Sequence, residues 1–494
     1  YFSTIVFFSQ YWPALPSCFP RVGECVPITN IPPPLIPWIG AFIGKLAFGD
    51  YMLAVEALRI LSFIATAVIL YKLALEFTGD HMAAILSVLV YSLNDFDLSY
   101  TFTGAFLRTQ YVILFLTCIS LYASKFIKNG KLNDLLLTGF FITLLFLTQI
   151  DQSLLFGGLT LTTYLLVKIV YYIISRSIGS VLSIRRTLLF VGLSFISAAP
   201  FLYIWQFHVY QRILRAFSTL QSEITPLITQ QTLTKFNFPE YGVLITISAI
   251  IGFILSILSK KNNNDELRYI LLAWFISTYI LGKFTGSAQI NPFLPRFLAV
   301  GVVPVSIFSG LCLSSFIKLS LLRITKISSI IFLCLFIAQI YSGTSSMVYS
   351  LNSSFLDESI IDTFTWIKDN TPENSTMFAS CNFHQIAYLY GFTNRTYIVS
   401  PSAEVVPGEY REYLIKYKVY LVLTLKDTQK ALEILENYSN VYIITAKKGY
   451  FSTYYDIEEQ AVKPLDLDKL RKYYPAVYEN EQYIVFRAEL KNEK

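Results

Sequence analysis

Ten stretches of about 20 mostly apolar residues are the feature that most constrains how this chain folds. A helix needs about 20 such residues to cross the hydrocarbon core of a bilayer, where each backbone polar group must be paired within the protein. The stretches lie at residues 53–76, 82–98, 104–127, 133–150, 152–175, 185–206, 241–260, 266–284, 297–318 and 325–347. They predict a polytopic α-helical membrane protein with about ten spans.

Lysine and arginine residues in the short loops predict the orientation of these spans. Basic side chains gather in the loops 125–131, 176–186, 260–268 and 318–326. With ten spans all four loops fall on one side, which the positive-inside rule assigns to the cytoplasm. We therefore expect a multi-pass plasma-membrane protein in which residues 1–50, several loops and the C-terminal region are extracellular.

A change in composition marks a domain boundary near Leu351. The last 144 residues hold 20 of the 33 acidic and 16 of the 39 basic residues, whereas the part before them is poor in charge. We therefore expect a first external loop at 1–50, a transmembrane domain at 51–350 and an external soluble domain at 351–494. In this last domain we predict helices at 357–370 and 427–438 and short strands at 377–380, 397–400, 419–425 and 441–445. Such alternation favours an α/β fold.

Four Asn-x-Ser/Thr triplets support an external C-terminal domain. They begin at Asn352, Asn374, Asn394 and Asn437, and all lie after the composition boundary. Such triplets accept N-linked glycans only on the external or luminal face. Together with the many Ile, Tyr, Lys and Ser residues, they suggest a glycoprotein of an archaeal cell surface.

The cysteines and histidines predict no metal site of their own. Cys18 and Cys25 lie in one polar loop and could form a disulfide if that loop is external. Cys118, Cys312 and Cys334 lie in apolar runs and are expected to be inert. The three histidines are far apart, which weighs against a histidine-based metal site.

Several short motifs carry a resemblance to a known superfamily. They are Ile-Pro-Pro-Pro-Leu-Ile-Pro at 31–37, Ala-Phe-Ile-Gly-Lys-Leu-Ala-Phe-Gly at 41–49, Leu-Arg-Ile-Leu-Ser at 58–62, Leu-Thr-Gln-Ile-Asp at 147–151 and Pro-Arg-Phe-Leu at 295–298. This pattern resembles the GT-C superfamily of membrane glycosyltransferases, in the branch of the protein O-mannosyltransferases and the aminoarabinose transferase of lipid A. The resemblance implies transfer of a sugar from a polyprenyl-phosphate donor to a protein or lipid acceptor on the external face.

Arginine is suited to the donor phosphate, because its planar guanidinium offers a fork of hydrogen-bond donors. Arg296 follows an external loop with two prolines, and Arg59 and Arg108 lie inside predicted spans, where a charge is costly and usually functional. These three arginines are our candidate phosphate ligands. Arg59 could instead simply pair with Glu56.

Carboxylates before the C-terminal domain are few, and two of them form an Asp-x-Asp pair. Asp95 and Asp97 lie in the second predicted external loop and could hold a divalent cation such as Mg²⁺ or Mn²⁺ through their oxygens. In related oligosaccharyltransferase catalytic subunits, an acidic pair in this loop helps to bind metal. A plain solvated turn explains the pair equally well.

The chain departs from the family in its first external loop. Family members use an acidic residue there, near the end of the first helix, as the base that activates the acceptor. No carboxylate lies between Tyr1 and Arg21, and Glu24 is the only one before the Pro-Pro-Leu motif. Glu24 could serve as the base, or the base could lie on a further span upstream of Tyr1, or the chemistry could be lost.

Two other functions stay open at this point. The missing acid favours a non-catalytic membrane subunit whose external domain binds a partner in a membrane complex or in the cell envelope. A transporter is disfavoured, because the sequence has no internal repeat and no paired broken helices. We expect contacts with membrane lipids and none with nucleic acid.

Overall fold

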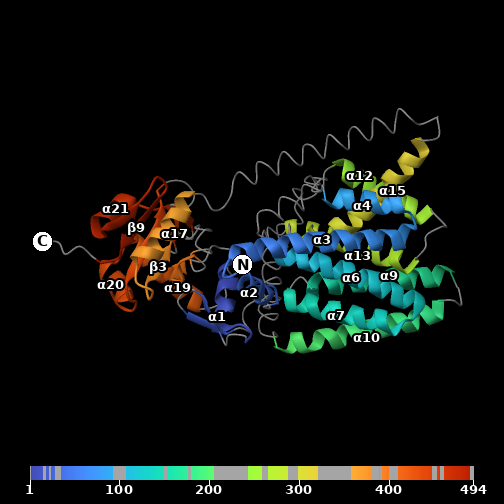
Figure 1. Ribbon diagram of the computed structural model, residues 1–494, viewed down its shortest axis with the longest axis horizontal. Helices are drawn as coiled ribbons and strands as arrows, with labels where there is room; N and C mark the ends of the chain where they lie inside the picture. The colour runs from blue at the N-terminus through green and yellow to red at the C-terminus, as the bar shows by residue number, and fades with distance from the viewer. Residues whose placement is uncertain are drawn as a thin grey trace. The chain divides into compact units, whose positions relative to one another are not determined.

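The computed structural model describes the chain in two compact units (Figure 1). The described residues are 2–14, 18–21, 24–27, 35–92, 107–149, 153–175, 180–204, 243–258, 265–287, 299–320, 358–379, 389, 392–399, 410–447, 453–456 and 461–489. One unit comprises residues 32–36 and 56–353, and the other comprises 1–31, 37–55 and 354–494. Of the residues before α3, 1–31 and 37–50 group with the C-terminal region, whereas 32–36 group with the other unit.

The first of these units is helical. Its elements are α3 (Tyr51–Thr78, which begins in the other unit), α4 (His81–Ser92), α6 (Leu107–Asn129), α7 (Leu132–Thr148), the π-helix η2 (Ser153–Gly157), α9 (Gly158–Ser175), α10 (Ser180–Ile204), α12 (Val243–Leu258), α13 (Asp265–Ser287) and α15 (Val302–Ser320). A helix lies at each predicted span except 325–347, which is outside the described residues. Within the described residues, three helical segments are long and apolar enough to cross a membrane, at Tyr51–Thr78, Leu107–Asn129 and Arg185–Ile204.

Small residues let three of these helices approach closely. Gly310 of α15 faces α4, where a Cβ atom would overlap the Ser87 side chain and the Ala83 carbonyl. Gly252 of α12 lies against the Phe308 carbonyl of α15, again with no room for a Cβ atom. Lipid tails give helices no hydrophobic reason to associate, so packing of this kind is a main source of their affinity.

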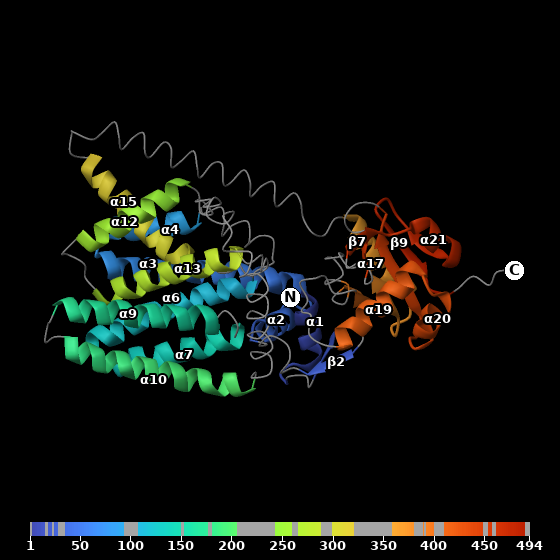
Figure 2. The same cartoon turned by 180° about the vertical axis from the view of Figure 1, so that it is seen from behind.

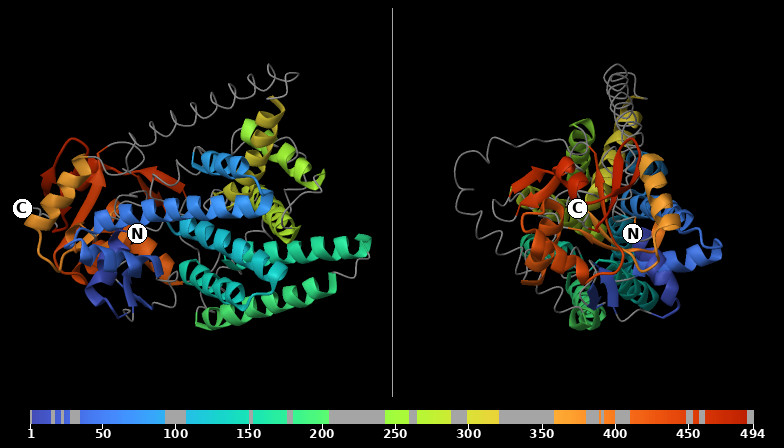
Figure 3. Two further views of the ribbon diagram at one scale, coloured as in Figure 1. Left: turned by 45° about the vertical axis from the view of Figure 1, so that its right-hand side comes forward. Right: turned by 90° about the vertical axis from the view of Figure 1, so that its left-hand side faces the viewer.

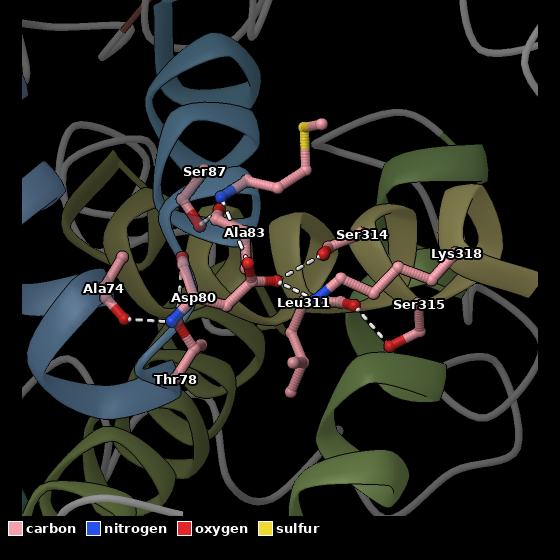
Figure 4. Close-up of polar contacts among 10 residues, drawn as sticks. Ala74, Thr78, Asp80, Ala83, Ser87, Leu311, Ser314, Ser315 and Lys318 are labelled. Atoms are coloured by element: carbon pink, nitrogen blue, oxygen red, sulfur yellow. Dashed lines mark hydrogen bonds and ion pairs between the residues drawn. The ribbon is translucent and has the colours of Figure 1, made fainter.

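A polar cluster joins α15 to the turn between α3 and α4 (Figure 4). Asp80 accepts hydrogen bonds from Lys318 Nζ at 2.7 Å and from Ser314 Oγ at 2.5 Å. Burial raises the pKa of Asp80, but the hydrogen bonds from Lys318 and Ser314 and the charge of Lys318 outweigh it and lower the pKa below its usual value. The ionised carboxylate is therefore the form that fits this cluster.

Two further contacts join helix ends that the charge pattern places on one side. Arg186 of α10 donates from Nη1 to the carbonyls of Ile127 and Lys128 in the last turn of α6, at 3.0 and 2.7 Å. Lys168 of α9 lies 2.8 Å from Glu266 in the first turn of α13. Like the Asp80 cluster, these contacts connect only residues from the predicted cytoplasmic side, as an alternating topology requires.

The N-terminal part of the second unit consists of two helices and a hairpin. Helices α1 (Phe2–Tyr11) and α2 (Leu35–Leu46) pack through Phe7, Phe8 and Ala41 (Figure 2). Strands β1 (Cys18–Arg21) and β2 (Glu24–Pro27) pair antiparallel between them in the sequence.

The C-terminal part is built on a five-stranded sheet of order β4-β3-β5-β9-β8. Its strands are β3 (Thr376–Ala379), β4 (Thr396–Val399), β5 (Val441–Ala446), β8 (Ala476–Glu479) and β9 (Tyr483–Arg487), and a second hairpin pairs β6 (Thr453–Asp456) with β7 (Ala461–Pro464). Strand β3 is parallel to both β4 and β5, whereas β9 is antiparallel to β5 and β8. The remaining helices are α17 (Glu358–Asn370), α19 (Tyr410–Thr424), α20 (Thr428–Glu436) and α21 (Leu467–Tyr473).

Helices cover both faces of this sheet (Figure 3). Along β3, Phe378 packs with α19, α20 and α21, while the neighbouring Met377 packs with α17 on the opposite face. All residues of β3 and β5 are buried, as expected for strands that are covered on both sides.

The predicted strand at 419–425 is wrong, because these residues complete helix α19 and the turn after it. Six of the seven residues in this segment are large and apolar, and such a run cannot be assigned to a strand or a helix by periodicity alone. All of it except Thr424 is buried, since α19 contacts both β4 and β6. The predicted strands at 377–380, 397–400 and 441–445 match β3, β4 and β5, and the predicted helices match α17 and α20.

Candidate functional site

Arg59 lies in the first half of α3, at the end that the topology places outside. Its side chain is 9% exposed and donates from Nη1 to Glu56 Oε1 at 2.8 Å, one helical turn earlier. Glu56 is about half exposed, so the pair is not sealed from solvent on its carboxylate side. The ion pair between Arg59 and Glu56 that the sequence allowed is present, and a guanidinium has five N–H donors in all.

Helix α6 carries a second candidate arginine, Arg108, near its predicted external end. Tyr111 of α6 donates its hydroxyl to the Leu58 carbonyl at 3.1 Å, and Ser62 of α3 donates to Gln110 Oε1 at 3.2 Å. These two bonds tie the first turns of α6 to the turn of α3 that carries Arg59. Arg108 lies in the first turn of α6, so these bonds join the parts of the two helices that carry the two predicted phosphate ligands.

Gln110 adds an unused donor to this end of the pair. Its side chain is 5% exposed, and its amide nitrogen finds no acceptor among the residues that the structure describes. A buried donor without a partner costs free energy, about 1–3 kcal/mol, unless something supplies an acceptor. Guanidinium and amide N–H groups are donors of the kind that bind an anionic oxygen ligand.

An apolar cavity of about 190 Å³ lies among α6, α7, α9, α10 and α13. Its wall is almost entirely hydrocarbon and aromatic, with Trp274, Phe156 and Phe190 among the lining side chains. The π-helix η2 and the start of α9 supply Gly157 and Gly158, which leave open space because no side chain projects there. Single π-helical turns inside helices are frequent at functional sites. A linear hydrocarbon chain suits such a wall.

The other predicted catalytic and phosphate-binding residues are not placed. Asp95, Asp97 and Arg296 lie outside the described residues, as does Asp151. Glu24 is placed by its backbone only, as the first residue of β2, where it pairs with Arg21. In the part of the chain that is described, no three or more His, Cys, Asp or Glu side chains gather to hold a metal ion. The cation site predicted at Asp95 and Asp97 stays a prediction.

The β1–β2 register places the two cysteines of the predicted disulfide. Cys18 stands opposite Pro27 and Cys25 opposite Pro20, so the cysteines lie two positions apart across the hairpin. Diagonal partners of this kind are about 7–8 Å apart at Cα, beyond the usual disulfide span of about 4.4–6.8 Å. The disulfide stays a prediction that requires the hairpin to adjust.

Three of the four sequon asparagines are described, and all three are exposed: Asn374, Asn394 and Asn437. Asn394 has a left-handed backbone with φ of 55°, and its side-chain oxygen accepts a bond from Gln10 at 3.2 Å. Asn352 lies outside the described residues. Exposure is a requirement for modification, and the glycans themselves stay predictions.

Sequence reasoning missed Gln110 and Ser62. Both are polar residues inside predicted spans, and Gln110 follows Arg108 by one half-turn, which is a signal that could have been used. It also missed the group around Lys168, which donates to Glu266 at 2.8 Å and to Thr187 at 2.7 Å. Tyr164 donates to the same Glu266 oxygen at 2.9 Å. That group needs side chains from α9, α10 and α13, which no local pattern brings together.

Comparisons with known proteins agree with the resemblance read from the sequence. The dolichyl-phosphate-mannose-protein mannosyltransferase family matches residues 32–205. Crystal structures of ArnT from Cupriavidus metallidurans are similar over 99% of this chain. The apo structure gives a TM-score of 0.59 at 11% identity over 92% of that chain, and the structure bound to undecaprenyl phosphate gives 0.53 at 10% identity over 93%. No curated protein sequence matches the chain. The chain thus has the fold of a multi-pass membrane protein.

Proposed function

We propose that this chain, whose fold is that of the GT-C membrane glycosyltransferases, moves a sugar from a polyprenyl-phosphate donor to an acceptor on the external face. The observation that carries the proposal is that two hydrogen bonds link the parts of α3 and α6 that carry Arg59 and Arg108, at their predicted external ends. The Gln110 amide nitrogen beside these bonds has no acceptor among the described residues. The similar family is named for dolichyl-phosphate-mannose, and one similar ArnT structure is bound to undecaprenyl phosphate; both compounds are polyprenyl phosphates.

In such a transfer the acceptor oxygen attacks the anomeric carbon of the sugar while the bond from that carbon to the phosphate oxygen breaks. The electron pair of that bond stays with the lipid phosphate, which gains negative charge. Arg59 and Arg108 would stabilise this charge through charge-assisted hydrogen bonds. The Glu56 carboxylate at 2.8 Å holds one side of Arg59 in place, so the guanidinium does not have to be ordered when the donor arrives.

The acceptor must lose a proton in this step, and the sequence offers few bases. Glu24 is our candidate, and a divalent cation (Mg²⁺ or Mn²⁺) held by Asp95 and Asp97 is the other predicted part of the centre. A metal there would draw charge from the phosphate oxygens. Arg296 would add a third guanidinium.

The apolar cavity would take part of the isoprenoid chain. It lies within helices that the sequence assigns to the membrane, and its lining offers little but hydrocarbon. Burial of apolar area there would add affinity that does not depend on the sugar. A donor with a shortened chain should therefore bind more weakly than the full-length donor.

The proposal also assigns a place and a role to the C-terminal domain. The C-terminal α/β domain is extracellular, carries glycans at the four sequons and helps to bind a protein or lipid acceptor. The proposal includes partners in a membrane complex and a location at an archaeal cell surface. Residues 325–347 form the last of the ten proposed spans.

The test of the phosphate site is donor binding by the full chain in proteoliposomes. Arg59→Ala and Arg108→Ala each remove a charge-assisted bond, about 1.5–3 kcal/mol, so each should weaken polyprenyl-phosphate binding about tenfold or more. Lys131→Ala, an exposed lysine at the predicted cytoplasmic side, is the matched loss of one positive charge and should leave binding unchanged. If all three variants weaken binding equally, the effect is a general electrostatic attraction and the assignment of Arg59 and Arg108 to the phosphate site is wrong.

A non-catalytic membrane subunit is the second candidate, favoured by the absence of a carboxylate between Tyr1 and Arg21. Such a subunit would keep the fold and could keep donor binding. It would release no polyprenyl phosphate from a sugar-linked donor, whatever acceptor is supplied.

A further inference from the structure

Two of the predicted sequons end at matching positions of the C-terminal sheet. The sequon of Asn374 ends at Thr376, the first residue of β3. The sequon of Asn394 ends at Thr396, the first residue of β4. These two threonines stand opposite each other in the parallel register of β3 and β4. In both sequons the asparagine is exposed, but the residue that carries the hydroxyl already belongs to the sheet.

Glycan attachment requires an enzyme to reach both ends of a sequon. The asparagine nitrogen Nδ2 forms a bond to the anomeric carbon of a lipid-phosphate-linked oligosaccharide, while the bond from that carbon to the phosphate breaks and its electron pair stays with the phosphate. The amide proton passes to a base of the enzyme. The fixed Ser or Thr at the third position means that the enzyme also contacts this hydroxyl. A third residue that is paired within a sheet must therefore leave its strand before the sequon can enter the enzyme.

The sequon of Asn374 is held by the strands on both sides of β3. Strand β3 pairs with β4 and with β5, and Ser375 and Thr376 are 0% and 6% exposed. The Thr376 amide donates to the Asn440 carbonyl at 3.3 Å, and the Asn440 side chain donates to Asn374 Oδ1 at 2.9 Å. Release of this sequon would break the pairing of β3 with both of its neighbours.

The sequon of Asn394 is held through its middle residue. The Arg395 side chain is 5% exposed and donates from Nη2 to the carbonyls of Lys368 and Thr371, at 3.0 and 2.7 Å. Asn394 itself has a left-handed backbone, and its Oδ1 accepts a hydrogen bond from Gln10 at 3.2 Å. Release of this sequon would pull Arg395 away from the end of α17 and break the pairing at the start of β4.

The sequon of Asn437 differs, because it lies in the turn between α20 and β5. Asn437 and Ser439 are both exposed, and Tyr438 between them is half-buried. Asn437 Nδ2 donates to the Glu433 carbonyl at 2.6 Å, an exposed bond that water can replace. The third residue lies two positions before β5 begins at Val441, so modification here leaves the strand pairing of the sheet intact.

We propose that Asn374 and Asn394 accept a glycan only while the C-terminal sheet is not formed, whereas Asn437 also accepts one in the folded protein. The proposal rests on the external, glycosylated C-terminal domain of the proposed function. A glycan on Asn374 or Asn394 then records attachment to a chain that had not yet folded. The order of folding and modification therefore decides the glycan pattern of this domain.

The test is glycosylation in vitro of the purified, unglycosylated full chain by an added oligosaccharyltransferase with its lipid-linked oligosaccharide. Unfolded references are three synthetic peptides, 370–380, 390–400 and 433–443, which carry one sequon each. Glycopeptide mass spectrometry gives the rate at each asparagine, and each rate is divided by that of its peptide. This ratio should be at least about tenfold higher at Asn437 than at Asn374 and Asn394, since a local opening that costs about 1.4 kcal/mol already gives that factor.

Two results would overturn the proposal. One is an equal ratio at the three asparagines, and the other is a ratio at Asn437 as low as at Asn374 and Asn394. Because the enzyme and the donor are supplied, neither result depends on whether this chain itself transfers a sugar.

Arg395→Ala gives a second measurement on the full chain. It keeps the sequon, whose middle residue is free to vary, and removes the bonds that hold it to α17. The rates at Asn394 and Asn374 should rise several-fold, because α17 packs on the sheet beside β3, whereas the rate at Asn437 should stay the same. Arg487→Ala, a change at the surface, is the matched control and should leave all three rates unchanged. A wild-type rate at Asn394 in Arg395→Ala would mean that the fold does not protect this sequon, and the proposal would be wrong.

Discussion

Arg395 is the residue whose removal gives the most clearly calculable effect on the C-terminal domain. Its buried guanidinium donates to the carbonyls of Lys368 and Thr371 at 3.0 and 2.7 Å, at the end of α17, and to the Thr393 carbonyl at 2.8 Å. A cation at a helix C-terminus also meets the negative end of the helix dipole. The side chain thus fastens α17 to the segment that enters β4.

Arg395→Ala leaves the two buried carbonyls of Thr371 and Thr393 without this donor. At about 1–3 kcal/mol for each buried unsatisfied group, we expect a loss of about 4 kcal/mol in the free energy of unfolding of this domain. Since 1.4 kcal/mol is a factor of about ten, hydrogen-exchange protection of the β3 amides should fall about a thousandfold. The sequon at Asn394 remains intact, because its middle residue is free to vary.

Hydrogen exchange by mass spectrometry on the full chain in detergent measures this loss. Arg487→Ala is the matched control, because that arginine pairs with Glu489 at the surface, where an ion pair contributes about 1 kcal/mol or less. If Arg395→Ala lowers protection no more than Arg487→Ala does, the buried carbonyls find other partners and our account of this contact is wrong.

Three further predictions concern the helical unit. Gly310→Val puts a side chain into the contact with α4 and should lower the free energy of unfolding by about 1–3 kcal/mol or more. Thermal unfolding in detergent measures this loss, and an unchanged transition would refute the close packing. The lowered pKa of Asp80 means that the stability its carboxylate contributes is present at neutral pH and is lost as pH falls through that pKa, below about pH 4. Asp80→Asn should abolish this acid-sensitive part of the melting profile, and a wild-type-like profile would contradict the role of its bond to Lys318. Lys168→Met removes the ion pair between Lys168 and the buried Glu266 and should cost about 3–5 kcal/mol, whereas the double variant with Glu266→Leu should recover most of it in the same assay.

The membrane helices could be predicted from sequence because lipid imposes one requirement on every span. An apolar run of about 20 residues has few other uses, so α3, α6 and α10 follow directly from composition. The short strands β3 and β5 could also be predicted, since their apolar residues are bounded by turn-forming residues. Val419–Leu425 was assigned wrongly because burial on several sides removes the helical periodicity on which such assignments depend.

Contacts between distant residues could not be predicted. Lys318 and Asp80 are 238 residues apart, and Ser62 and Gln110 are 48 apart, so only the packing of the helices brings them together. The choice of Arg59 and Arg108 rested on the cost of a charge in a membrane, which is a local argument. That the parts of α3 and α6 that carry them are joined by hydrogen bonds is a property of the fold.

The most direct test of the proposed function is turnover of a sugar-linked polyprenyl phosphate by the purified full chain in proteoliposomes, with an extract of membrane lipids or cell-surface protein as acceptor. Released polyprenyl phosphate is measured for the wild type, Arg59→Ala and Lys131→Ala. We predict release by the wild type and Lys131→Ala, and a loss of about tenfold or more for Arg59→Ala. No release by the wild type while donor binding persists would contradict the transferase assignment and favour the non-catalytic subunit.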